Sequence, residues 1–82
     1  INRALPDAEL DAAVDAMARG LAAGPQIAIR MCKSNLRTSM DGTIDEALET
    51  EAVNQGACFK SKDFAEGVMA FMQKRKPNFK GE

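Results

Sequence analysis

The sequence predicts an all-α chain of about four helices. Apolar residues recur at steps of three and four in four separate segments, which is the spacing of one face of a helix. Helix-breaking residues separate the segments, as at Gly24-Pro25 and at Met40-Asp41-Gly42. The connections between the segments are short, which favours a compact helical subdomain.

The first helix is predicted near residues 7–23. Asp7 follows Pro6 and can cap this helix. Its apolar face consists of residues spaced by four, three and four positions, namely Leu10, Val14, Met17 and Leu21. Gly24 then ends the helix, and Pro25 is well placed to start the next one because proline suits the first helical position.

The second helix is predicted near residues 25–39. Its apolar positions keep helical spacing and comprise Ile27, Ala28, Met31, Cys32 and Leu36. The basic residues Arg30, Lys33 and Arg37 fall elsewhere on the same helix, so we expect a basic outer face.

The third and fourth helices are predicted near residues 44–59 and 62–75. Thr43 and Glu46 have the spacing of a capping box, in which each side chain satisfies a free amide of the other residue. Ser61 can cap the fourth helix, which should end before Pro77 because proline lacks the amide that a helix needs. The apolar face of the fourth helix comprises Phe64, Val68, Phe71 and Met72.

Composition excludes several classes of function. The chain has 82 residues and a formal net charge of −1, so its total charge does not indicate binding to nucleic acid. No apolar run approaches the ~20 residues of a membrane span, and we expect no membrane contact and a cytoplasmic location. Cys32 and Cys58 lack CxxC spacing and the chain has no histidine, so reduced, buried thiols are expected and no metal site is predicted.

The chain offers no candidate catalytic residue. It lacks histidine, tyrosine and tryptophan, which removes the commonest general base. Glu46, Glu49 and Glu51 belong to the first turns of one helix, where acidic side chains complement the helix dipole. Cys32 has no partner base that would activate its thiol.

A basic tail, residues 74–82, is the only candidate ligand site. Its cations cluster at a helix C-terminus and comprise Lys74, Arg75, Lys76 and Lys80. Such side chains can bind a phosphate, and the flanking Phe71 and Phe79 could carry a purine ring. The residues alone favour a solvated basic tail over a nucleotide site.

Several blocks of the chain, taken in order, resemble the C-terminal region of the enoyl-CoA hydratase/isomerase (crotonase) superfamily. These blocks are INRALPDAEL, LAAGPQIAIRMCKSNL, IDEALETEA and CFKSKDFAEGVMAFMQKRKPNFKG. The resemblance covers nearly the whole chain. It implies that residues 1–82 form the single C-terminal helical (oligomerisation) subdomain of a crotonase-like fold, and that the N-terminal ββα core with the catalytic glutamates is absent.

The resemblance also implies a function for the parent enzyme. That enzyme, a lyase or isomerase of fatty acid metabolism, would hydrate an enoyl-CoA or shift its double bond, with acyl-CoA as substrate and no tightly bound cofactor. The helices would cover the acyl-CoA site and form a homo-oligomer, a trimer or a dimer of trimers, and this fragment alone would not be catalytically competent. Phe71 and Lys74 match the family residues that reach the adenine and phosphate end of coenzyme A.

Two alternatives remain open at this point. The chain could be a free-standing helical module that binds a protein partner through its Met- and Phe-rich faces without catalysis. It could also belong to an enzymatically inactive relative of the crotonases.

Overall fold

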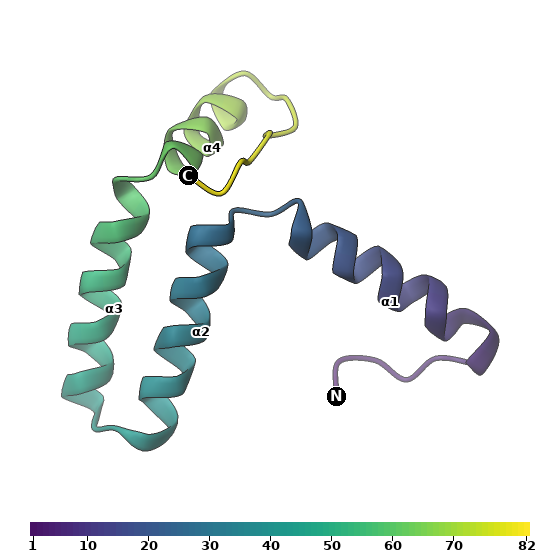
Figure 1. Cartoon of the computed structure of the whole chain (residues 1–82), viewed down its shortest axis with the longest axis horizontal. Coiled ribbons are helices and arrows are strands. Elements are labelled where there is room, and N and C mark those ends of the chain that lie inside the picture. The colour runs from purple at the N-terminus through teal and green to yellow at the C-terminus, as the bar shows by residue number, and fades with distance from the viewer.

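The computed structural model describes all 82 residues and contains four α-helices and no strand. The helices are α1 (Asp7–Ala22), α2 (Gln26–Asp41), α3 (Ile44–Phe59) and α4 (Lys62–Met72), and the tail, residues 73–82, follows α4 (Figure 1). The predicted all-α fold is therefore confirmed.

Local hydrogen bonds fix the starts of α3 and α4. The hydroxyl of Thr43 accepts a hydrogen bond from the Glu46 amide at 3.3 Å, and the Glu46 carboxylate accepts one from the Thr43 amide at 2.7 Å. This is the predicted capping box. The Ser61 hydroxyl accepts a hydrogen bond from the amide of Phe64 at 3.0 Å, which is the predicted cap of α4.

The first two helices differ slightly from the prediction. Asp7 is the first residue of α1 and not its cap: the N-cap position is Pro6, and no side chain caps the helix. Asp7 instead complements the helix dipole from the first turn. α2 continues past residue 39 to Asp41, because the amide of Gly42 still donates to the carbonyl of Thr38 at 2.8 Å.

α4 ends at Met72, before the predicted end at residue 75. Lys74 has a φ of 52°, which lies in the left-handed region and cannot continue the helix. The amide of Arg75 donates to the carbonyl of Ala70 at 3.0 Å, and that of Lys74 to the carbonyl of Phe71 at 3.1 Å. These two bonds form a Schellman motif with lysine at the position where glycine is usual.

The four helices have an open arrangement (Figure 1). α2 and α3 lie side by side as an antiparallel hairpin, joined across their faces by a 2.5 Å hydrogen bond from Asn54 Nδ2 to Asn35 Oδ1. α4 lies at the end of the hairpin where α2 begins and α3 ends, and the tail folds back along α4. α1 extends away from the other three helices.

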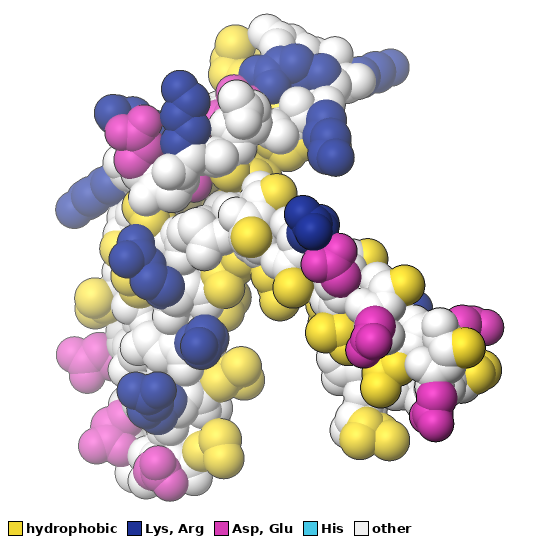
Figure 2. Space-filling model, turned by 45° about the vertical axis from the view of Figure 1, so that its right-hand side comes forward, with side chains coloured by type: hydrophobic (Ala, Val, Ile, Leu, Met, Phe, Trp, Pro, Cys, Tyr) yellow, Lys and Arg dark blue, Asp and Glu magenta, His cyan; other side chains and the backbone are white.

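The chain leaves most of its apolar side chains uncovered. Its accessible surface is 6795 Å², which is ~2,000 Å² more than a compact protein of this mass would have. The radius of gyration is 15.8 Å, against ~12 Å for a compact chain of this length. Only Ala70 and Asp63 are buried. Figure 2 shows hydrophobic side chains at the surface of both α1 and the hairpin.

This openness makes two expectations wrong, namely the compact subdomain and the buried thiols. Cys32 is exposed and Cys58 is half-exposed, although both thiols were expected to be buried. Both cysteines lie on apolar helix faces, and the contacts within this chain leave Cys32 exposed. No helix combines the length and the apolar character that crossing a membrane requires.

Candidate functional site

The candidate site lies where α4 ends and the tail turns back over it. One anchor of the tail is Asp63, a residue that is only 4% exposed. Its two carboxylate oxygens accept hydrogen bonds from the amides of Lys80 and Gly81 at 2.7 and 2.9 Å. The amide of Asp63 in turn donates to the carbonyl of Glu82 at 2.9 Å. These bonds hold the end of the tail against the first turn of α4.

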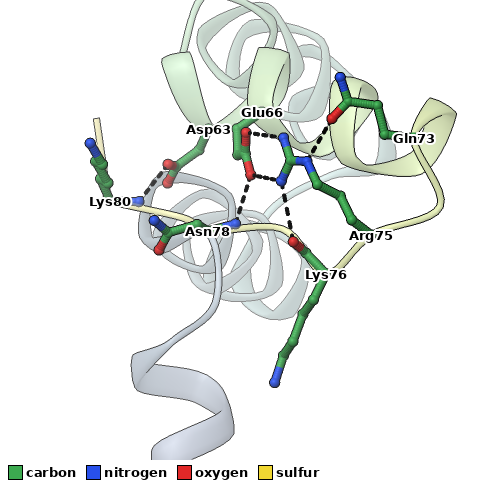
Figure 3. Close-up of polar contacts among 7 residues, drawn as sticks. All are labelled: Asp63, Glu66, Gln73, Arg75, Lys76, Asn78 and Lys80. Carbon is green, nitrogen blue, oxygen red and sulfur yellow. Dashed lines mark hydrogen bonds and ion pairs between the residues drawn. The ribbon is translucent and has the colours of Figure 1, made fainter.

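A second anchor, the Glu66–Arg75 clamp, lies between α4 and the tail (Figure 3). Arg75 donates from Nη1 and Nη2 to the two oxygens of Glu66 at 2.6 and 2.9 Å, and the amide of Asn78 donates to Glu66 Oε1 at 2.8 Å. The Arg75 hydrogen bond, followed by that from Asn78, lowers the pKa of Glu66 to about 2. Glu66 is therefore ionised throughout the neutral range, so protonation does not break the clamp there.

The structure divides the four cations of the basic tail into two kinds. The guanidinium of Arg75 is engaged by Glu66, by Gln73 Oε1 at 2.7 Å and by the carbonyl of Lys76 at 3.2 Å, so it is a paired cation although its side chain is partly exposed. The ammonium groups of Lys74, Lys76 and Lys80 form no hydrogen bond or ion pair. A uniformly solvated basic tail is thus wrong for Arg75, because the tail folds back onto an acidic residue of α4.

An open apolar groove of about 380 Å³ runs beside α4. It is lined by Pro25, Ala28, Cys58, Ser61, Asp63, Phe64, Gly67, Val68, Phe71 and Phe79. The ring of Phe79 reaches the groove from the tail and lies over Gly67, where an added Cβ would be 3.6 Å from the ring. The tail therefore forms one wall of the groove, and aromatic faces within it can pack against a planar apolar ring.

The two predicted ligand residues lie together at the C-terminal end of α4. Phe71 is in the last turn and is 85% exposed, while Lys74 is in the left-handed turn that follows. An unpaired ammonium beside an exposed phenyl ring can attract an anion attached to an aromatic group. Both side chains are therefore free to meet a ligand from outside this chain.

Sequence reasoning missed Asp63 and Glu66. Their partners lie 17 and nine residues further along the chain, beyond the range of helical periodicity. The available signal was the presence of two carboxylates on a mainly apolar helix followed by a basic tail. The acidic residues of α3 show no comparable site, since Glu46 is held in the capping box, and no group of residues could hold a metal ion.

Comparison with known proteins relates the whole chain to one family. The sequence model of the family described as enoyl-CoA hydratase/isomerase matches residues 1–82. The solved enoyl-CoA hydratase of Geobacillus kaustophilus HTA426 matches all of this chain with a TM-score of 0.90 and 33% identity. The four helices and their open arrangement thus recur in that enzyme, where they make up 31% of the chain.

Two curated relatives also match this chain in sequence. The crotonyl-CoA hydratase of Syntrophomonas wolfei is 35% identical over 79 residues, which are 96% of this chain and 30% of the relative. The 1,2-epoxyphenylacetyl-CoA isomerase of Escherichia coli is 35% identical over 66 residues, which are 80% of this chain and 25% of the relative. This chain spans less than a third of the length of these relatives. On the match to the full 82 residues, the chain belongs to the enoyl-CoA hydratase/isomerase family.

Proposed function

We propose that this chain acts as the C-terminal helical part of an enoyl-CoA hydratase or isomerase, where it covers the acyl-CoA site and contacts neighbouring subunits of a trimer or a dimer of trimers. The observation that carries the proposal is the ~2,000 Å² of surface that a compact chain of this mass would not expose. Much of the exposed surface carries large apolar side chains, which need a cover, and a catalytic core together with adjacent subunits would supply one.

The substrate in this proposal is an acyl-CoA thioester, and no tightly bound cofactor is required. Phe71 presents its ring at the adenine end of coenzyme A, and Lys74 presents an ammonium to the 3′-phosphate. The exposure of the Phe71 ring and the unpaired state of Lys74 support these roles. A lysine suits a phosphate because it supplies charge without demanding a fixed geometry.

The reaction in this proposal is the addition of water to an enoyl-CoA double bond, or a shift of that bond. The groups that transfer protons belong to a part of the enzyme outside these residues. This chain contributes binding energy at the nucleotide end of the substrate and excludes water from the acyl site. Substitutions of its substrate-binding residues should therefore change KM more than kcat.

The test uses the full-length enzyme with Phe71→Ala and Lys74→Ala in a crotonyl-CoA hydration assay. Lys74→Ala should raise KM about tenfold or more, because a hydrogen bond to a charged group contributes about 1.5–3 kcal/mol. Phe71→Ala should raise KM about two- to tenfold, because an aromatic pair contributes about 0.5–1.5 kcal/mol, and both variants should leave kcat nearly unchanged. Lys33→Ala, which removes an exposed lysine from α2, is the matched control. Unchanged KM values in both site variants would contradict the assigned binding roles.

A second test addresses assembly. X-ray scattering of the isolated chain should give associated or expanded particles, because a lone monomer would leave its apolar faces in water. A stable, compact monomer with a radius of gyration of ~12 Å would argue against the proposal. That result would favour a free-standing helical interaction module instead.

A further inference from the structure

The turn that carries Lys74 is an unfavourable conformation for lysine. A non-glycine residue in the left-handed region costs roughly 1–2 kcal/mol, and this lysine has a φ of 52°. Surrounding contacts must therefore hold the turn. The two Schellman hydrogen bonds hold it from the helix side, and the Glu66–Arg75 clamp begins at the very next residue.

The hydrogen bonds of the Glu66–Arg75 clamp restrict the relative orientation of its two side chains. Arg75 uses Nε, Nη1 and Nη2 together, and its two parallel bonds to Glu66 have the fork arrangement that adds directional specificity. The Glu66 side chain is 25% exposed and that of Arg75 41%, whereas the partners in the two other ion pairs of the chain are 52–79% exposed. The clamp is thus the most sheltered ion pair of the chain.

The clamp also connects both sides of the turn. Glu66 belongs to α4, and it holds Arg75 immediately after Lys74 as well as the amide of Asn78 further along the tail. Asp63 holds the tail again at Lys80. These contacts restrain the chain before and after residue 74, and so restrict the point from which the Lys74 ammonium extends.

We propose that Glu66 and Arg75 are positioning residues for the phosphate subsite: the clamp holds the left-handed turn and thereby places the Lys74 ammonium at the phosphate of the nucleotide end of coenzyme A. This inference rests on the proposed function. It gives two adjacent cations different roles. Lys74 binds the phosphate, whereas Arg75 donates its hydrogen bonds to other groups of this chain. Hydrogen bonds from Arg75 and Asn78 lower the pKa of Glu66 to about 2, so protonation does not open the clamp in the neutral range.

The test is a charge-conserving double variant, Glu66→Gln with Arg75→Gln, in the full-length enzyme. Calorimetry measures the affinities for coenzyme A and for 3′-dephospho-coenzyme A, and their ratio reports how well the protein recognises the phosphate. The net charge is unchanged, so long-range attraction of the ligand is preserved. We expect the ratio to fall about fivefold, equivalent to about 1 kcal/mol, through weaker binding of coenzyme A alone.

Two controls accompany the double variant. Asp15→Asn with Arg19→Gln removes an exposed ion pair from α1, away from the tail, and should leave the ratio unchanged. Arg75→Lys keeps the charge but loses the two parallel hydrogen bonds to Glu66, and should lower the affinity ratio by a smaller factor. General damage to the tail would weaken both ligands equally and leave the ratio as it was, so that result would overturn the inference.

Lys74→Ala separates the inference from the function on which it rests. If Lys74→Ala abolishes the preference for coenzyme A while the double variant retains it, the positioning inference is wrong and the proposed function stands. If Lys74→Ala leaves the preference intact, the binding role of Lys74 is wrong and the inference falls with it. A loss of preference in both variants supports both proposals.

Discussion

Replacing Asp63 by asparagine should release the end of the tail. The Asp63 carboxylate is buried and accepts hydrogen bonds from the Lys80 and Gly81 amides at 2.7 and 2.9 Å. Asparagine can accept only one of these bonds, because its NH₂ group would face the second amide as donor against donor. Losing one hydrogen bond to a charged group costs about 2 kcal/mol, which corresponds to about a 30-fold change in the local opening equilibrium.

Amide hydrogen exchange measures this opening residue by residue. The Lys80 and Gly81 amides should exchange about 30-fold faster in Asp63→Asn, while the amides within α1 and the α2–α3 hairpin keep their rates. Asp11→Asn, at an exposed position of α1, is the matched control and should change neither amide. Exchange of Lys80 and Gly81 at the original rate in Asp63→Asn would refute the reasoning that this carboxylate anchors the tail.

Four further predictions concern the local structure. Because folding lowers the Glu66 pKa from 4.5 to about 2, the clamp contributes fully above pH 4.5 and is lost as the pH falls toward 2. The Asn78 amide shift, followed by NMR, should titrate near pH 2, and a midpoint near 4.5 would contradict the clamp. Thr43→Ala should lower the free energy of unfolding in urea by about 1 kcal/mol through loss of the capping box, and an unchanged midpoint would contradict that role. Gly56→Ala, which meets nothing within 4 Å, should raise this free energy by about 0.5–1 kcal/mol. A lower free energy of unfolding in Gly56→Ala would instead reveal a close neighbour outside this chain. Gly42→Ala should lower the free energy of unfolding, because the added Cβ would lie 2.8 Å from a backbone oxygen.

The left-handed residue at position 74 links stability to the proposed binding role. A glycine there would adopt the same turn at no steric cost and complete an ordinary Schellman motif. The protein instead has a lysine, which is less stable in that conformation. A binding site at the end of α4 would account for this loss of stability, because it would require a charged side chain at this position.

The sequence by itself determined the helices. Their apolar faces follow from spacing, and the starts of α3 and α4 follow from Thr43, Glu46 and Ser61, because caps and helical periodicity involve residues within a few positions of one another. The end of α4 was less predictable. Pro77 set only an outer limit, and the left-handed turn at Lys74 is not encoded by a glycine.

Only the tertiary structure decided how the tail is used. The pairing of Glu66 with Arg75 and of Asp63 with the Lys80 amide depends on the direction that the chain takes after Lys74. No local pattern specifies that direction, so the sequence presented Arg75 as one more free cation of the basic tail. The structure instead separates Arg75, which holds the tail, from Lys74, which remains free, because a carboxylate brought close in space satisfies the guanidinium before any ligand can.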